Sequence, residues 1–322
     1  MSVVTGDVPS DKIRMKRRDL MRGLVVSAGA GVLAGCSTPL ALPQFAPPPS
    51  PAMRVASFNI RYIDLTEPLQ TNSQSLRNWQ ARRRAVVSAL RGINADIMAF
   101  QEMESWDGTP QSGAPIQRTW LSSQMPEYSS ASCTCSDGLE SGQPIFFRHA
   151  RFSVIEEGTT PIGTVIGPAL ERAHIRAAAI AGYSDVVSWA RFRDRMTGEY
   201  LMVVNLHLHF VNQLRQEGAA QLAVQIARAA IERDDHVVVL GDLNVVASAR
   251  PLRVMRDGNL TLIPSEGASF HFDTGLHLYG AIDHILHGPR LRAMGTTQVL
   301  RGQVEGVWPS DHYPIWVDLQ PI

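Results

Sequence analysis

Short apolar runs, most of them rich in valine, isoleucine or phenylalanine, recur along the chain from residue 53 onward. Runs of this length and composition are typical of β-strands. We predict strands at residues 53–60, 96–102, 144–148, 152–156, 185–194, 201–209, 236–243, 281–287 and 314–319. A polar turn sequence ending in glycine, at 194–198, predicts a hairpin between two of these strands.

Apolar positions spaced by three or four residues predict helices at 78–91 and 212–233 and a shorter one at 116–124. Because strands and helices intermix, we expect an α/β or α+β layered fold. Residues 54–322 contain no second linker and no internal repeat that we detect, so we expect them to form one domain.

The first 36 residues have a different pattern. A basic cluster that includes Arg17 and Arg18 precedes an apolar run of small and aliphatic residues at 23–35, which is too short to span a bilayer comfortably. This order is typical of an export signal, and the arginine pair resembles a twin-arginine leader. A buried helix is the alternative interpretation of the apolar run.

Leu-Ala-Gly-Cys at 33–36 resembles a bacterial lipobox, in which Cys36 would become the lipid-modified first residue of the mature protein. The next segment, 37–53, has six prolines and is predicted to act as an extended tether. We therefore expect a signal peptide at 1–36 and an exported, monomeric protein, anchored by lipid to a membrane in the periplasm or at the cell surface.

The composition, 44% hydrophobic and 19% charged, excludes a disordered or fibrous chain. Basic and acidic residues balance at 30 each, so no overall charge favours nucleic acid or an anionic membrane, although a local basic patch is still compatible. No lysine follows Lys16. This argues mildly against tight binding of a nucleic-acid duplex.

Several predicted strands end in polar side chains that an apolar core would exclude. Burial of an unpaired carboxylate costs several kcal/mol, so this repeated placement is improbable unless the strand ends converge on a site. The polar residues at or next to these ends are Asn59, Gln101, Glu102, His207, His209, Asp242, Asn244, Asp283, His284, Asp311 and His312.

The residue types in this set indicate its chemistry. Carboxylates and amides without a cysteine ligand suit a hard cation such as Mg²⁺ or Mn²⁺. Histidines beside carboxylates supply general acid and base groups or stabilise charge that develops on phosphorus. We therefore expect metal-assisted hydrolysis of a phosphoester.

Six segments resemble, in the same order, motifs of the endonuclease/exonuclease/phosphatase superfamily. They are Phe-Asn-Ile-Arg-Tyr at 58–62, Gln-Glu at 101–102, Asn-Leu-His-Leu at 205–208, Gly-Asp-Leu-Asn at 241–244, Ile-Asp-His at 282–284 and Ser-Asp-His-Tyr-Pro at 310–314. The resemblance covers residues 54–322. Within this range, three further segments at 144–148, 189–194 and 269–271 also resemble the family. It implies a four-layer α/β/β/α sandwich, with two facing mixed β-sheets flanked by helices and the site at one end.

The same resemblance assigns roles around the metal and the water. It implies that Glu102 is the principal metal ligand, with Asn59 and Asp311 close to the metal. Asp242 would orient or deprotonate the attacking water, and Asn244 would hold that water or a phosphate oxygen. A lone acid of this kind is more often a helix cap or part of a surface ion pair, so these assignments depend on the whole ordered set.

The histidines complete the implied site. His312 would contact the phosphoryl oxygens and would be oriented by Asp283 through its other ring nitrogen, while His207 would bind the phosphate or assist the leaving group. Many bacterial relatives have a carboxylate two residues after the motif histidine, where this chain has His209. We interpret His209 as a rim residue, with recruitment of a transition metal or contact with phosphate as the alternatives.

Arginines are the remaining candidates for substrate binding. Arg61, Arg148 and Arg191 are expected to contact a substrate phosphate, and Arg215 is a further candidate, although solvation at the surface is an equal alternative for each. The predicted function is a divalent-metal phosphoesterase, more specifically a phosphodiesterase, that acts on a nucleic acid, a phospholipid or a sugar phosphate. The alternatives are a nuclease and a non-catalytic surface lipoprotein that uses the scaffold for binding.

Overall fold

The computed structural model describes residues 44–66, 73–107, 115–134, 141–162 and 186–322. All of these lie within one compact unit, Pro39–Ile322. The predicted signal peptide at 1–36, with Cys36, lies outside the described residues. Within the described ranges, no helix has both the length and the apolar character that a membrane span requires.

One of the two large sheets has seven strands in the described residues. Its order is β13-β15-β1-β3-β6-β5, and β14 pairs with β15 at its side. The strands are β1 (Met53–Asn59), β3 (Ile97–Gln101), β5 (Tyr128–Ala131), β6 (Ile145–Arg148), β13 (Leu291–Ala293), β14 (Gln298–Val299) and β15 (Ile315–Pro321). The central pair, β1 and β3, is parallel, with Asn59 opposite Gln101.

The other large sheet has six strands in the order β11-β12-β10-β9-β8-β7. The strands are β7 (Phe152–Pro161), β8 (Val186–Asp194), β9 (Tyr200–His207), β10 (His236–Asp242), β11 (Thr261–Leu262) and β12 (Asp283–His287). Here too the central pair, β9 and β10, is parallel, and Asp242 lies opposite His207. A separate small pair joins β2 (Ile63–Asp64) to β4 (Ser105–Trp106).

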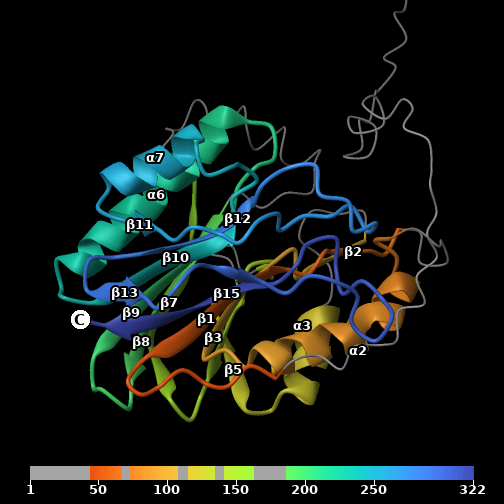
Figure 1. Ribbon diagram of the computed structural model, residues 1–322, viewed down its shortest axis with the longest axis horizontal. Helices are drawn as coiled ribbons and strands as arrows, with labels where there is room; N and C mark the ends of the chain where they lie inside the picture. Colours follow the sequence, from red (N-terminus) through yellow and green to blue (C-terminus); the bar gives the residue numbers. More distant parts are fainter. Residues whose placement is uncertain (1–43, 67–72, 108–114, 135–140, 163–185) are drawn as a thin grey trace, which may run out of the picture. The chain divides into compact units, whose positions relative to one another are not determined.

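The sheets face each other across an apolar layer built from alternate residues of β1, β3 and β15 on one side and β8, β9, β10 and β12 on the other. Helices α2 (Leu76–Ile93) and α3 (Ile116–Gln124) cover the outer face of the seven-stranded sheet, and α6 (Gln213–Ile231) and α7 (Arg250–Asp257) cover that of the six-stranded sheet (Figure 1). The predicted four-layer sandwich is confirmed.

Local signals explain the helix limits. The Ser75 side chain accepts a hydrogen bond from the backbone N–H of Asn78 and caps α2, which ends at Asn94 in the left-handed conformation. Asn212 caps α6 in the same way by accepting from the backbone N–H of Arg215. Both helices bury an apolar face against the sheets. Burial of this face, and not intrinsic helix propensity, provides most of their stability.

The structure differs from the predicted elements at several places. β7 runs to Pro161, five residues beyond the prediction, because it pairs with β8 along its whole length. β5 and α7 were not predicted, since β5 has two serines at its centre and α7 has only eight residues. β9 ends at His207, so the predicted extension of this strand to His209 is wrong.

The described part of the predicted tether packs against the domain. The Phe45 ring lies 4.5 Å from the Trp316 ring, measured between centroids. The Phe45 backbone N–H donates to the Gly92 carbonyl, and the Arg54 side chain donates to the Ala46 carbonyl. Residues 45 and 46 are therefore fixed to the seven-stranded sheet and to α2.

Candidate active site

The ends of the central strands bring the predicted polar residues together. β1 and β3 in one sheet, and β9 and β10 in the other, are parallel pairs that end at the same edge of the sandwich. The antiparallel β12 begins at this edge, where Asp283 lies opposite Asp242. Because carboxyl ends of parallel strands meet at one edge, side chains far apart in the sequence become neighbours.

The side chain of Asn59 joins the two sheets at this edge. Its Nδ2 donates to Glu102 Oε1 at 3.0 Å and to Asp242 Oδ2 at 2.9 Å, and its Oδ1 accepts from the Arg61 backbone N–H at 3.0 Å. These three partners fix the orientation of the amide. Asn59 therefore orients two acidic side chains, and its oxygen is not the atom that faces them.

Glu102 owes its position to an unusual backbone conformation. Alternation along β3 places Gln101 toward the other sheet and would place the next side chain on the opposite face. The strand ends at Gln101, and Glu102 has φ of 57°, which returns its carboxylate to Asn59. Strained, left-handed residues such as this one persist where the surroundings enforce them, and they cluster at functional sites.

A glycine is required beside Asp242. Gly241 has φ of 146°, and a Cβ at this position would lie 1.9 Å from the carbonyl oxygen of Leu206 in the neighbouring strand. The backbones of β9 and β10 can therefore approach each other only because this residue lacks a side chain. Asp242 itself is held by the backbone N–H of Asn244, which donates to Asp242 Oδ1 at 2.9 Å.

His207 lies against both acids. Its Nε2 is 3.4 Å from Asp242 Oδ2 and 3.8 Å from Glu102 Oε1. The ring is buried, at 9% exposure. This places an imidazole within reach of any molecule that binds between the two carboxylates.

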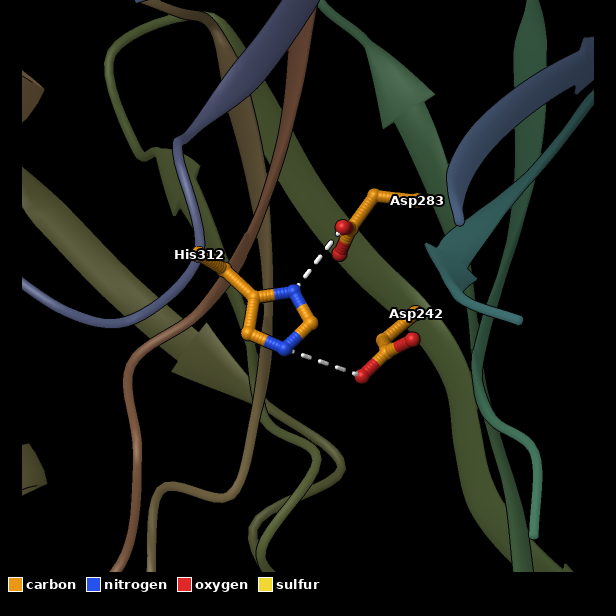
Figure 2. Close-up of side chains that lie close together, drawn as sticks. All are labelled: Asp242, Asp283 and His312. Carbon is orange, nitrogen blue, oxygen red and sulfur yellow. Dashed lines mark hydrogen bonds and ion pairs between the residues drawn. The ribbon is translucent and has the colours of Figure 1, made fainter. Parts of the chain in front are cut away.

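His312 lies between two aspartates (Figure 2). Its Nδ1 is 2.9 Å from Asp283 Oδ2, and its Nε2 is 3.6 Å from Asp242 Oδ2. Burial would lower the pKa of His312, but the nearby charges of Asp283 and Asp242 outweigh it and raise the pKa to about 9. The ring is therefore an imidazolium at neutral pH.

Ser269 extends this arrangement and was not given a role by the sequence analysis. Its hydroxyl donates to Asp283 Oδ2 at 2.6 Å and accepts from the backbone N–H of Asp283 at 3.0 Å. Two hydrogen bonds to one oxygen of Asp283, from Ser269 and from His312, fix the carboxylate. The signal that could have identified Ser269 is its place in the motif at 269–271.

Arg61 is part of the site's framework. Its Nε lies 3.1 Å from Asp311 Oδ1, its Nη2 pairs with Asp273, and its side chain is only 2% exposed. Burial would lower the pKa of Arg61, but the two carboxylates outweigh it and keep the pKa above its usual value. The guanidinium that was predicted to contact the substrate is therefore directed at carboxylates of the chain itself, and Asp311, predicted to lie near the metal, is its partner.

Two other predicted substrate contacts lie elsewhere. Arg148 ends β6 at the far edge of the sheet, where its side chain donates to Asn94 Oδ1 and to the Tyr128 hydroxyl, both at 2.7 Å. Arg191 lies opposite Met202, near the start of β9, and pairs with Asp235. Both strand positions are remote from the carboxyl ends, so the structure does not bring these arginines to the site.

The other histidines considered in the sequence have structural partners. His209 Nδ1 accepts from the backbone N–H groups that precede α6, which is a position at the rim. His271 is buried and stacks on Tyr313, with ring centroids 4.2 Å apart. His284 donates from Nε2 to the Val245 carbonyl at 2.8 Å, and burial lowers its pKa.

The donor set fits a hard divalent cation. Glu102 and Asp242, both buried, direct oxygens at one amide, and the nearest nitrogen ligand is His207. Oxygen donors of this kind suit Mg²⁺ or Mn²⁺. Asp242, Asp283 and His312 also offer ligand atoms within 4.8 Å of one another, but Asp283 and His312 already bind each other, which leaves the Glu102 side the better position for a cation.

Comparisons with known proteins agree with this geometry. The family model described as "Endonuclease/Exonuclease/phosphatase family" matches residues 56–312. A solved structure of a protein from Bacteroides vulgatus, named for the same three activities, is 23% identical with a TM-score of 0.65, and the match covers 84% of this chain and 99% of that one.

Two further solved structures have named activities. A mannosyl-6-phosphatase from Bacteroides thetaiotaomicron is 21% identical, with a TM-score of 0.64 and coverage of 83% of this chain and 99% of its own. Sphingomyelinase C from Streptomyces griseocarneus is 15% identical, with a TM-score of 0.60 and coverage of 84% and 99%. No curated protein sequence matches the chain. The family model covers well over half of the sequence, and the chain therefore belongs to the endonuclease/exonuclease/phosphatase family.

Proposed function

We propose that the protein is a divalent-metal-dependent phosphoesterase that hydrolyses a phosphate ester, with a phosphodiester favoured over a monoester, by in-line attack of water. One observation carries the proposal. Asn59 joins Glu102 of one sheet to Asp242 of the other, and the same Asp242 oxygen lies 3.6 Å from Nε2 of the charged His312. A carboxylate that can bind a cation, a carboxylate that can act as a base and a positively charged imidazolium thus lie around one point.

Each side chain then has a role that its contacts support. Glu102 would hold the cation, which when bound neutralises phosphate charge and makes water more acidic. Asp242 orients the attacking water and takes its proton. His312, fixed as an imidazolium by Asp283, donates a hydrogen bond to a phosphoryl oxygen as negative charge increases there.

The reaction balances with these groups. The water oxygen forms a new bond to phosphorus while the bond from phosphorus to the leaving oxygen breaks. The water proton passes to Asp242, and the leaving oxygen takes a proton. His207, whose Nε2 is 3.4 Å from Asp242, supplies that proton in its protonated form, or it binds the phosphate while a solvent water supplies the proton.

The substrate is proposed to be a phospholipid or a sugar phosphate ester. Solved structures with this fold include a sphingomyelinase and a mannosyl-6-phosphatase, which supports both classes. We favour a nucleic acid less, because no lysine follows Lys16 and the buried Arg61 is paired with the chain's own acids. We also propose export and a lipid anchor at Cys36, which rest on the sequence alone.

The test is hydrolysis of an aryl phosphodiester, an aryl phosphomonoester, a phospholipid and single- and double-stranded DNA, each with Mg²⁺, with Mn²⁺ and with a chelator. Glu102→Gln removes charge while preserving size, and His312→Ala removes the imidazolium. Glu232→Gln and His149→Ala are matched controls at exposed positions.

We expect metal-dependent hydrolysis that the chelator abolishes. Both site variants should lose activity by at least 100-fold, while both controls keep it. A protein that cleaves none of these esters with either metal, or one that remains fully active as Glu102→Gln, would refute the proposal.

A further inference from the structure

A layer of buried polar side chains lies between the two sheets, one step inside the site. Ser57 lies two residues before Asn59, Gln101 directly precedes Glu102, and Asn205 lies two residues before His207. All three are at most 1% exposed, and the next inward-facing residues deeper between the sheets, Val55, Ala99 and Val203, are apolar. Polar groups are costly in such a place unless they are hydrogen-bonded, so their partners show what they do.

The side-chain amide of Asn205 makes its hydrogen bonds across the space between the sheets. Its Oδ1 accepts from Gln101 Nε2 at 2.7 Å. Its Nδ2 donates to the Phe100 carbonyl at 2.8 Å and to the Gln143 carbonyl at 3.0 Å. Asn205 belongs to the six-stranded sheet, whereas Phe100 and Gln101 belong to β3 of the other sheet.

These bonds have directions and lengths that apolar contacts lack. Val203, the previous inward-facing residue of β9, packs in the apolar layer, where contacts tolerate sliding of one sheet over the other. Three hydrogen bonds from one amide fix both the separation and the register of the sheets at this level. The Ser57 hydroxyl donates to Gln101 Oε1 at 3.3 Å and limits rotation of the glutamine amide.

We propose that Asn205 is a positioning residue, which through Gln101 and the Phe100 carbonyl sets the distance between the sheet that carries Glu102 and the sheet that carries Asp242 and His207. This inference rests on the proposed function, because a cation and a phosphate can be shared between the sheets only at one separation. Asn205 is close to the site, because its partner Gln101 directly precedes Glu102 and Asn205 itself lies on the same strand face as His207.

A purely structural role for Asn205 makes a different prediction. Loss of buried hydrogen bonds lowers stability wherever they lie, but it need not change cation affinity or turnover of the protein that remains folded. Tyr128→Phe is the matched control, since it removes a buried hydroxyl that donates to the Ala95 carbonyl at 2.6 Å, at the end of the seven-stranded sheet far from the site.

The experiment compares the wild type, Asn205→Leu, Asn205→Ser and Tyr128→Phe, each at a temperature where it is folded. Two quantities are measured: the Mn²⁺ concentration that gives half of the maximal rise in thermal midpoint, without substrate, and kcat and KM for an aryl phosphodiester at saturating Mn²⁺. The exchange variant Gln101→Asn/Asn205→Gln restores an amide pair of the same total length.

We expect the Mn²⁺ concentration that gives half of the maximal rise in thermal midpoint, the half-point for Mn²⁺, to increase about tenfold or more in both Asn205 variants. The fall in kcat should be greater than the change in KM. The exchange variant should recover part of each loss, and Tyr128→Phe should lose stability only. Asn205→Ser is small enough to fold if the leucine does not fit.

Three outcomes would count against the inference, and they can be distinguished. If the folded Asn205 variants keep the wild-type half-point for Mn²⁺ and the wild-type kcat, the positioning role is refuted while the proposed function stands. If Tyr128→Phe shows the same losses, the effect is one of general stability and the positioning role is again refuted. If the wild type shows neither a Mn²⁺ response nor hydrolysis, the proposed function fails and this inference fails with it.

Discussion

Replacement of Asp283 by asparagine tests the electrostatics of the site with little change in shape. The Asp283 carboxylate is 2.9 Å from His312 Nδ1, and it is the largest of the charges that raise the pKa of His312 from 6.5 to about 9. An amide keeps the size of the side chain and removes its charge. In Asp283→Asn, the pKa of His312 should therefore fall by more than 1, since burial of the ring then has less to oppose it.

The sign of the effect follows from where the proton is held. The folded protein binds the His312 proton more tightly than the unfolded chain does, so the stabilisation is complete below pH 6.5 and is lost as the pH rises toward about 9. The difference between these two pKa values corresponds to roughly 3 kcal/mol of free energy of unfolding. In the wild type, activity that needs the imidazolium should persist to about pH 9 and then decline.

The assay is kcat/KM for an aryl phosphodiester between pH 6 and 10, together with denaturant unfolding over the same range. Asp283→Asn should move the alkaline decline to lower pH and reduce the loss of unfolding free energy between pH 6.5 and 9. Asp318→Asn, which breaks the ion pair with Arg54 on the opposite edge, is the matched control. An alkaline limb at the wild-type position in Asp283→Asn would refute the reasoning.

Four further predictions concern single residues. Gly241→Ala should destabilise the fold by about 1–3 kcal/mol or prevent folding, because its Cβ meets a backbone carbonyl at 1.9 Å; an unchanged thermal midpoint would contradict this. Arg61→Ala should lower the free energy of unfolding by about 3–5 kcal/mol, since it leaves two carboxylates without their buried partner. Arg148→Ala should leave kcat/KM within about twofold of the wild type. A large loss of kcat/KM in Arg148→Ala would show that Arg148 reaches the substrate. Cys36→Ala should release the protein from the membrane fraction, and an unchanged distribution on fractionation would contradict the anchor.

Much of the fold could be predicted from the sequence because the strands are long and apolar. Residues 236–243 are almost continuously apolar up to Gly241, as expected for a strand buried on both faces, and the structure has β10 there. The resemblance in motif order then indicated the sandwich. β5 was missed because serines occupy its two central positions, where edge-strand pairing with β6 rather than side-chain pattern decides the structure.

The candidate site was predicted as a set together with one internal contact, that of His312 with Asp283, but its other internal contacts were not. Residue type and strand-end position brought Asn59, Glu102 and Asp242 into one prediction, and they do lie together. The partner of Arg61 could not be predicted in this way, because Asp273 lies 212 residues away in a loop without a pattern of its own. For Arg148, the sequence does not tell which edge of the sheet the residue occupies.

In the proposed site, Glu102 of one sheet holds a hard cation beside Asp242 of the other sheet. A crystal soaked in Mn²⁺ and measured for anomalous scattering tests it most directly. We predict one strong peak about 2.1–2.3 Å from a Glu102 carboxylate oxygen, on the side of Asp242, which is absent in Glu102→Gln. A wild-type crystal with bound Mn²⁺ only at other positions, or hydrolysis that continues after complete chelation, would contradict the account.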